Sequence, residues 1–364
     1  MRILHIVGAR PNFMKVAPVV RSLNRIDAID QVLIHTGQHY DDNMSNVFFQ
    51  ELGMKQPDVN LQVGSGSHAV QTAQIMMKLE GIVTEHRPDL VLVYGDVNST
   101  VAASLVCSKL NIAIGHVEAG LRSNDRSMPE EINRIVTDQL SDILFTPSID
   151  ANENLLHEGV ESDRIFLVGN VMIDTLVRLL PQTEQRGIIS DLSLTPKHYG
   201  LVTLHRPSNV DDLGGLKELM LTLLQISNHV PIVFPVHPRT RKQLATLGLQ
   251  RSTASLRLLE PLSYLDFLSL QRYAMMVITD SGGVQEETTY LGVPCLTMRD
   301  STERPITIDI GSNILIGSDT SVLLKECQYI LNGKVKMNKI PLLWDGEASG
   351  RIANIIRDTF LRTT

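Results

Sequence analysis

Residues 90–100 read LVLVYGDVNST and are the clearest indication of the fold in this chain. The first five are apolar, mostly leucine and valine, without the alternation expected of a half-buried strand. A continuous run of this kind is typical of a parallel strand whose two faces are both covered by helices. A glycine, an aspartate and a polar helix start follow the run, which predicts one βα unit of an α/β fold.

The same pattern recurs along both halves of the chain. We expect strands at residues 2–7, 32–35, 90–94, 112–117, 143–146, 165–168, 201–204, 232–236, 256–259, 275–279, 295–298 and 314–316. Segments with helical periodicity follow these runs. The sequence therefore predicts an α/β protein with two doubly wound, Rossmann-like domains.

The weakest pattern lies at residues 180–198, where prolines and a glycine interrupt a polar stretch, and we place the linker there. An N-terminal domain would then span residues 1–180, and a C-terminal domain residues 199–349. Residues 350–364 have the apolar spacing of an amphipathic helix. We expect this helix to pack back on the first domain.

Composition narrows the class of protein. With 364 residues, 43% of them hydrophobic, the chain is long enough for two cores. A net charge of −7 without basic runs argues against a nucleic-acid or membrane-surface partner. Three widely spaced cysteines favour buried thiols in the cytoplasm over a disulfide framework. No Walker A motif or zinc-type spacing occurs, so we predict neither a metal nor a cofactor.

Two acids follow neighbouring predicted strands, at the edge where open α/β sheets bind ligands. Asp96 comes after residues 90–94, and Glu118 ends the stretch 112–118. Asp96 is also a residue type that caps helices, which is the plainer alternative. Glu118 is a poor cap in an apolar stretch, where a carboxylate is costly unless it is paired or functional. Both are candidate catalytic acids.

Further polar groups follow other predicted strands. Arg10 and Lys15, after the first strand, would reach a diphosphate or simply face solvent. Glu130 and Glu131 open a helix, where compensation of the helix dipole explains one of them. His205 stands beside Arg206 at a strand end, which favours a role in proton transfer over a purely structural one.

The strongest local motif is Thr279-Asp280-Ser281-Gly282-Gly283, directly after a predicted strand. Two glycines allow backbone N–H groups to approach a phosphate at a helix N-terminus. Glu287, about one turn later, is suited to bind ribose hydroxyls, by analogy with the acid of dinucleotide sites. Arg299 and Arg304 add cations after the next strand. A tight strand-to-helix turn without a ligand is the alternative interpretation.

Taken together, these segments resemble the non-hydrolysing UDP-N-acetylglucosamine 2-epimerases over nearly the whole chain. The resemblance rests on residues 8–15, 95–96, 116–122, 129–134, 205–206, 281–287 and 302–305. It implies the GT-B fold, in which two domains face a cleft, and a homodimer. It also implies interconversion of UDP-N-acetylglucosamine and UDP-N-acetylmannosamine by elimination and re-addition of UDP.

The resemblance also implies the roles of individual residues. By motif, the catalytic residues would be Asp96, Glu118, Glu130 and His205. Glu131 is the alternative to Glu130, because the loop after Glu118 is shorter than in the family's common pattern. UDP would be bound by Arg10, Lys15, His237, Phe267, Ser281, Gly282, Gly283, Glu287 and Arg304.

One departure concerns activation and substrate. Relatives activated by a second nucleotide sugar have a glutamine where Gln38-His39-Tyr40 leads here to Asp41. A carboxylate cannot donate a hydrogen bond and repels a diphosphate, so we predict no such activation. This form is similar to relatives that act on modified UDP-acetamido sugars such as diacetamido uronic acids. Such an epimerase, a hydrolysing epimerase, a glycosyltransferase of the same fold and a non-catalytic nucleotide-sugar sensor are the alternatives.

Overall fold

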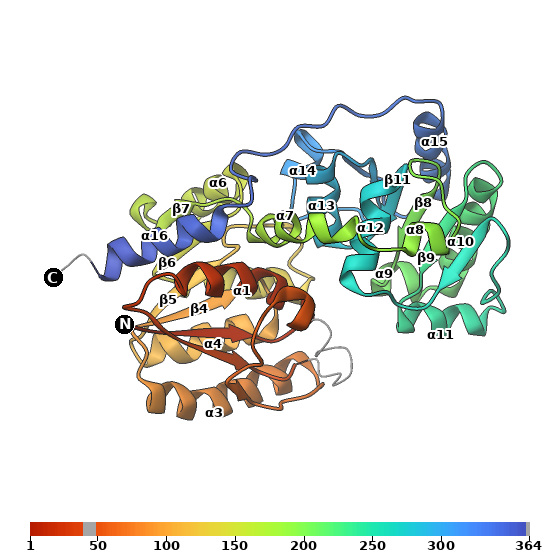
Figure 1. Ribbon diagram of the computed structural model, residues 1–364. Coiled ribbons are helices and arrows are strands. Elements are labelled where there is room, and N and C mark those ends of the chain that lie inside the picture. Colours follow the sequence, from red (N-terminus) through yellow and green to blue (C-terminus); the bar gives the residue numbers. More distant parts are fainter. Residues whose placement is uncertain (39–48, 362–364) are drawn as a thin grey trace. The chain divides into compact units, whose positions relative to one another are not determined.

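A computed structural model describes residues 1–38 and 49–361, apart from the side chain of Arg10. Within this part the chain is an α/β protein that divides into two compact units (Figure 1). The first comprises Met1–Arg178 and Leu342–Thr364, and the second comprises Leu179–Pro341. None of the described helices combines the length and the apolar character that a membrane span requires.

The first unit is built on a parallel sheet with strand order β3-β2-β1-β4-β5-β6-β7. Its strands are β1 (Arg2–Val7), β2 (Asp30–His35), β3 (Val59–Asn60), β4 (Leu90–Tyr94), β5 (Ala113–Val117), β6 (Ile143–Thr146) and β7 (Ile165–Leu167). In register, Ile3 of β1 pairs with Leu90 of β4. Because the order reverses between β1 and β4, the switch point lies at the carboxyl ends of these two strands.

Helices cover both faces of this sheet, with α1 and α16 on one side and α3 and α4 on the other (Figure 1). The helices are α1 (Arg10–Leu23), α3 (His68–His86), α4 (Asn98–Lys109), α5 (Pro129–Leu140), α6 (Ile149–His157), η1 (Ser162–Arg164) and α16 (Ala348–Phe360), and α7 (Val171–Thr183) follows β7. Leu79 of α3 and Ala103 of α4 pack on Val91 and Val93 of β4. The apolar run at residues 90–94 is thus buried completely.

The C-terminal helix α16 belongs to the first unit and packs against α1. Asp174 of α7 accepts hydrogen bonds from the backbone N–H groups of Ala348 at 3.0 Å and Ser349 at 2.7 Å. These donors are among those that a helix N-terminus leaves without intrahelical partners. A carboxylate about 170 residues away in sequence therefore fixes the start of this helix.

The second unit has its own parallel sheet, with order β10-β9-β8-β11-β12-β13. The strands are β8 (Gly200–Thr203), β9 (Ile232–Pro235), β10 (Leu256–Leu259), β11 (Met276–Thr279), β12 (Cys295–Thr297) and β13 (Asn313–Leu315). The helices are α8 (Ile188–Asp191), α9 (Pro207–Val210), α10 (Leu213–Ser227), α11 (Pro238–Thr246), α12 (Tyr264–Tyr273), α13 (Gly282–Leu291), α14 (Ile306–Asp309) and α15 (Thr320–Leu331). Here the switch point lies between β8 and β11.

The predicted fold class, an α/β protein with two doubly wound parallel sheets, is confirmed. The predicted strands 2–7, 90–94, 143–146 and 256–259 have the observed bounds, and most others differ by one or two residues. β3 was not predicted, because two residues are too few for a sequence pattern. Its pairing with β2 depends on the tertiary structure.

Candidate active site

In the first unit, the carboxyl ends of β1, β4 and β5 bring predicted site residues together. Lys15 lies on α1, Asp96 follows β4 and Glu118 follows β5. The backbone of Glu118 has a φ of +78°, in the left-handed region that residues other than glycine rarely occupy. Strain of this kind clusters at functional sites, where the surrounding structure holds it in place. This geometry favours a functional role for Glu118.

Lys15 and Glu118 form a buried ion pair, with 8% and 6% of their side chains exposed. A Cβ atom on Gly95 would lie 2.6 Å from the Nζ of Lys15 and 3.4 Å from Oε2 of Glu118. Glycine at this turn therefore leaves room for the pair. The predicted partner of Lys15 is a diphosphate, whereas in this structure its ammonium group balances a carboxylate of its own unit, as a buried charge requires.

Asp96 faces α5 and does not cap the helix after β4. Its Oδ2 accepts a hydrogen bond from Nη1 of Arg134 at 2.5 Å, and 28% of its side chain is exposed. Val97 is the N-cap residue of α4, and its side chain makes no capping hydrogen bond. The backbone carbonyl of Asp96 accepts a hydrogen bond from Asn133 Nδ2 at 2.9 Å. Asp96 is thus a positioned, partly accessible carboxylate.

The two acids at the start of α5 have different surroundings. Glu131 is 1% exposed and accepts hydrogen bonds from the backbone N–H groups of Ser123 at 3.0 Å and Asn124 at 2.8 Å. Its carboxylate also pairs with Arg134 at 2.6 Å. Burial by itself would raise the pKa of Glu131, but these partners outweigh burial and lower it. Glu130 is half-buried and has no side-chain hydrogen bond or ion pair within the described residues.

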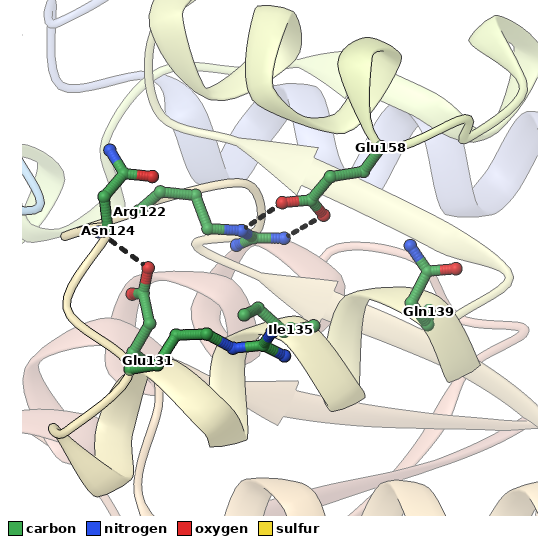
Figure 2. Close-up of a pocket in the computed structure, with 7 residues that line it drawn as sticks. Arg122, Asn124, Glu131, Ile135, Gln139 and Glu158 are labelled. Carbon is green, nitrogen blue, oxygen red and sulfur yellow. Dashed lines mark hydrogen bonds and ion pairs between the residues drawn. The ribbon is translucent and has the colours of Figure 1, made fainter.

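A pocket of about 490 Å³ opens beside Glu131. It is lined by Arg122, Asn124, Arg126, Glu131, Ile135, Gln139 and Glu158. Figure 2 shows the guanidinium group of Arg122 turned toward Glu158, and the carboxylate of Glu131 turned toward Asn124. Arg122 donates from Nε and Nη2 to the two oxygens of Glu158, at 2.7 and 2.6 Å. These charges are therefore balanced within the unit.

Two predictions fall outside the part of the chain that the structure describes. One is the side chain of Arg10, a predicted ligand of the diphosphate. The other is Asp41, which lies within residues 39–48. It is the residue from which we predicted that a second nucleotide sugar does not activate the protein. Both stay predictions.

In the second unit, His205 and Asp280 meet at the switch point between β8 and β11. Asp280 is fully buried and directly follows β11. Its carboxylate accepts hydrogen bonds from the backbone N–H groups of His205 at 3.0 Å and Arg206 at 2.9 Å, and from Asn209 Nδ2 at 3.0 Å. Burial would raise the pKa of Asp280, but His205 and the other donors outweigh burial and lower it.

This arrangement orients His205 for proton transfer. Its Nδ1 lies 2.9 Å from Oδ1 of Asp280, and an ionised carboxylate only accepts hydrogen bonds, so Nδ1 carries a proton. The side chain is 41% exposed, which leaves Nε2 available to gain or lose a proton. The ring of His237 lies 5.8 Å away between centroids, and burial lowers the pKa of His237, with His205 adding to the effect.

The start of α13 offers hydrogen-bond donors. Ser281 is its N-cap residue, and the Ser281 side chain makes no capping hydrogen bond. Its hydroxyl group and the first N–H groups of the helix are available to an anion. A Cβ atom on Gly282 would lie 2.6 Å from Nη1 of Arg304, so glycine allows this close approach. Arg304 itself is buried and pairs with Glu286 at 2.7 Å and with Glu303.

Two further predicted residues lie on α12 and α13, which are in contact. Glu287 of α13 is buried and accepts a hydrogen bond from the Tyr264 hydroxyl group at 2.7 Å. Burial raises the pKa of Glu287 to about 7. Phe267 of α12 is half-buried and packs against the core cluster that includes Tyr199 and Val277.

Two residues of these sites were not predicted from the sequence, Asp280 and Arg134. Asp280 precedes the Ser-Gly-Gly turn. An acidic residue directly after an apolar strand was the sequence feature that could have identified it. Arg134 bridges Asp96 and Glu131, and helical spacing predicts only its contact with Glu131. Among residues 1–38 and 49–361, no three His, Cys, Asp or Glu side chains converge as a metal site requires.

The profile of the UDP-N-acetylglucosamine 2-epimerases matches residues 21–357. The chain belongs to this family. A UDP-N-acetylglucosamine 2-epimerase of Methanocaldococcus jannaschii is 42% identical, over 98% of this chain and 99% of the relative. The crystal structure of the M. jannaschii UDP-GlcNAc 2-epimerase in complex with UDP-GlcNAc and UDP has a TM-score of 0.91, covering 98% and 100% of the two chains.

The family includes relatives named for different sugars at almost the same identity. A UDP-2,3-diacetamido-2,3-dideoxy-D-glucuronate 2-epimerase of Pseudomonas aeruginosa is 41% identical, over 98% of this chain and 99% of the relative. The resemblance found in the sequence is confirmed at the level of the family. A difference of one per cent in identity does not distinguish the two sugars.

Proposed function

We propose that this chain is a non-hydrolysing epimerase that interconverts UDP-N-acetylglucosamine and UDP-N-acetylmannosamine. The observation that carries the proposal is the presence of two unlike switch points, one in each unit. One presents positioned carboxylates, and the other presents an oriented histidine beside a helix N-terminus. The complex of the M. jannaschii relative with UDP-GlcNAc and UDP supports the choice of ligand.

The chemistry explains why both kinds of group are needed. The C2 proton of the sugar has no adjacent carbonyl, so simple deprotonation is implausible. Elimination removes this proton and breaks the C1–O bond, UDP leaves with the bonding electrons, and a 2-acetamidoglucal remains. Re-addition of UDP at C1, with protonation of C2 on the opposite face, gives the epimer. Each proton transfer requires a positioned acid or base, and donors stabilise the departing UDP.

We assign roles as follows. Asp96, Glu118, Glu130 and His205 form the proton-transfer set, with Glu130 preferred because Glu131 holds the loop at Ser123. The UDP ligands are Arg10, Lys15, His237, Phe267, Ser281, Gly282, Gly283, Glu287 and Arg304. Within this set Ser281, Gly282 and Gly283 are the best placed to meet a phosphate, because they are the N-cap residue and the first two residues of α13.

The proposal is tested by incubating the protein with UDP-N-acetylglucosamine in heavy water and following the products by proton NMR. We expect deuterium at C2 of both UDP-sugars and no free amino sugar. Release of free N-acetylmannosamine with UDP would indicate a hydrolysing epimerase. Binding of UDP without any exchange at C2 would indicate a sensor and would contradict the proposal.

A second candidate function is epimerisation of a UDP-diacetamido uronic acid, favoured by the P. aeruginosa relative. Both sugars carry a 2-acetamido group, so the same elimination applies. Measuring kcat/KM on both substrates decides between them. We expect the larger value with UDP-N-acetylglucosamine, and the opposite ranking would replace the primary proposal.

We also propose that the chain forms a homodimer. Met77 and Val70 on α3 and Ile132 on α5 are exposed apolar residues of the first unit, with Met77 78% exposed. Light scattering after size-exclusion chromatography measures the mass directly, and a monomer at micromolar concentration would contradict this part of the proposal.

A further inference from the structure

His116 is a fully buried histidine beside the turn that presents Asp96. It lies on β5, two residues before Glu118. Its Nδ1 is 2.6 Å from Oδ1 of Asp138, and its Nε2 is 2.9 Å from the carbonyl oxygen of Gly95. Neither ring nor carboxylate is exposed. The ring therefore connects α5 to the residue that precedes Asp96.

Both partners of His116 are hydrogen-bond acceptors. Asp138 also accepts hydrogen bonds from the backbone N–H group of Gly120 at 3.1 Å, and it pairs with Nη1 of Arg122 at 2.7 Å. The guanidinium group of Arg122 and the N–H group of Gly120 both stabilise the ionised form of Asp138. Asp138 is thus an ionised acceptor, and the carbonyl of Gly95 has no proton to donate.

We propose that His116 is a positioning residue held as an imidazolium, whose two N–H groups clamp the Gly95 carbonyl to Asp138. A neutral imidazole has one N–H group and one lone pair, so its lone pair would face an acceptor at one of these two short distances. The buried charges balance, because His116 and Arg122 are matched by Asp138 and Glu158. A buried cation is tolerated only with such partners.

The clamp fixes the turn that carries Asp96. The N–H group of Gly95 donates to the carbonyl of Val117 at 3.0 Å, and its carbonyl accepts from His116. Both backbone groups of Gly95 are then occupied, at a φ of +64°. A displacement of about 1 Å in a reacting group costs about 100-fold in rate. This consequence for activity rests on the proposed function, whereas the protonation state of His116 does not.

The protonation state is tested by nitrogen-15 NMR of the protein labelled at histidine, with His116→Gln used to assign the signals. Near neutral pH, we expect both ring nitrogens of His116 to be protonated. His157, an exposed histidine of the same unit, is the control residue. In Asp138→Asn, the amide can donate to Nδ1, so the ring becomes neutral while Nε2–H still reaches Gly95. An unprotonated ring nitrogen on His116 in the unaltered protein near neutral pH would overturn the proposal.

Activity tests the positioning role separately. We expect His116→Gln to lower kcat about tenfold to 100-fold with little change in KM or UDP affinity, and His157→Gln to leave both unchanged. Asp138→Asn should keep more activity than His116→Gln, because the contact with Gly95 is retained. Unchanged kcat in His116→Gln would remove the positioning role. If the chain proved not to be an epimerase, the NMR result would still decide the protonation state.

Discussion

The two units share the order of their first six strands but carry different chemistry at their switch points. In the first unit each candidate acid with a known contact is paired with a cation, Glu118 with Lys15 and Asp96 with Arg134. In the second unit a buried acid, Asp280, orients a histidine, and the N-cap residue of α13, Ser281, makes no capping hydrogen bond with its side chain. The same fold supports both arrangements because the chemistry depends on the residues after the strands.

The largest effects are expected at Glu118 and His205, one proposed catalytic residue from each unit. We expect Glu118→Ala and His205→Ala each to lower turnover at least about 100-fold, the usual scale for losing a positioned acid or base. UDP affinity should stay nearly unchanged in His205→Ala. Steady-state kinetics and calorimetry with UDP measure the two effects, with exposed Glu80→Gln as control. Unchanged turnover in either variant would remove that residue from the mechanism.

Glu287 differs from the acids of the first unit, because burial, and not a cation, governs its protonation. Its pKa is raised by burial from 4.5 to about 7. The folded protein therefore binds this proton more tightly than the unfolded chain does, and stability is lost as pH rises from about 4.5 to about 7, by a few kcal/mol at most.

Thermal denaturation across this pH range measures the effect. Relative to Glu287→Gln, the unaltered protein should lose stability as pH rises through the window. Glu80→Gln retains Glu287 and should show the same loss of stability as the unaltered protein. A pH-independent difference between the unaltered protein and Glu287→Gln would contradict the neutral state of Glu287.

The pair Glu130 and Glu131 separates a chemical role from a structural one within the first unit. We expect Glu131→Gln to lower the free energy of unfolding by about 2 kcal/mol, because it loses charge-assisted bonds with Arg134 and the loop. Glu130→Gln should leave the melting temperature unchanged while lowering kcat. The reverse result would exchange the roles of the two residues.

The smallest expected effect concerns Ser281. Replacing Ser281 by alanine removes one donor to the diphosphate and should weaken UDP binding about tenfold, the scale of one hydrogen bond to a charged group. Ser190, an exposed serine of the same unit, provides the matched control as Ser190→Ala. Calorimetry that shows the unaltered affinity in Ser281→Ala would exclude its hydroxyl group from the phosphate site.

Much of this arrangement could be predicted from local sequence. Apolar runs such as residues 90–94 indicate buried parallel strands, and in parallel sheets the residues after them share one edge. That reasoning placed Asp96, Glu118, His205 and Ser281 at strand ends, as observed. The capping role considered for Asp96 was wrong, because α4 begins at Asn98 with Val97 as its N-cap residue.

Local sequence determined every strand except β3, the turns after those strands and the family. Only the tertiary structure decided which charges meet, because those pairs join residues far apart in the chain. Lys15 contacts Glu118 because β1, β4 and β5 are adjacent in the sheet. His116 contacts Asp138 because α5 packs beside β5. Ion pairing depends on distances of a few ångströms and on burial. Neither quantity is encoded in a local pattern of residue types.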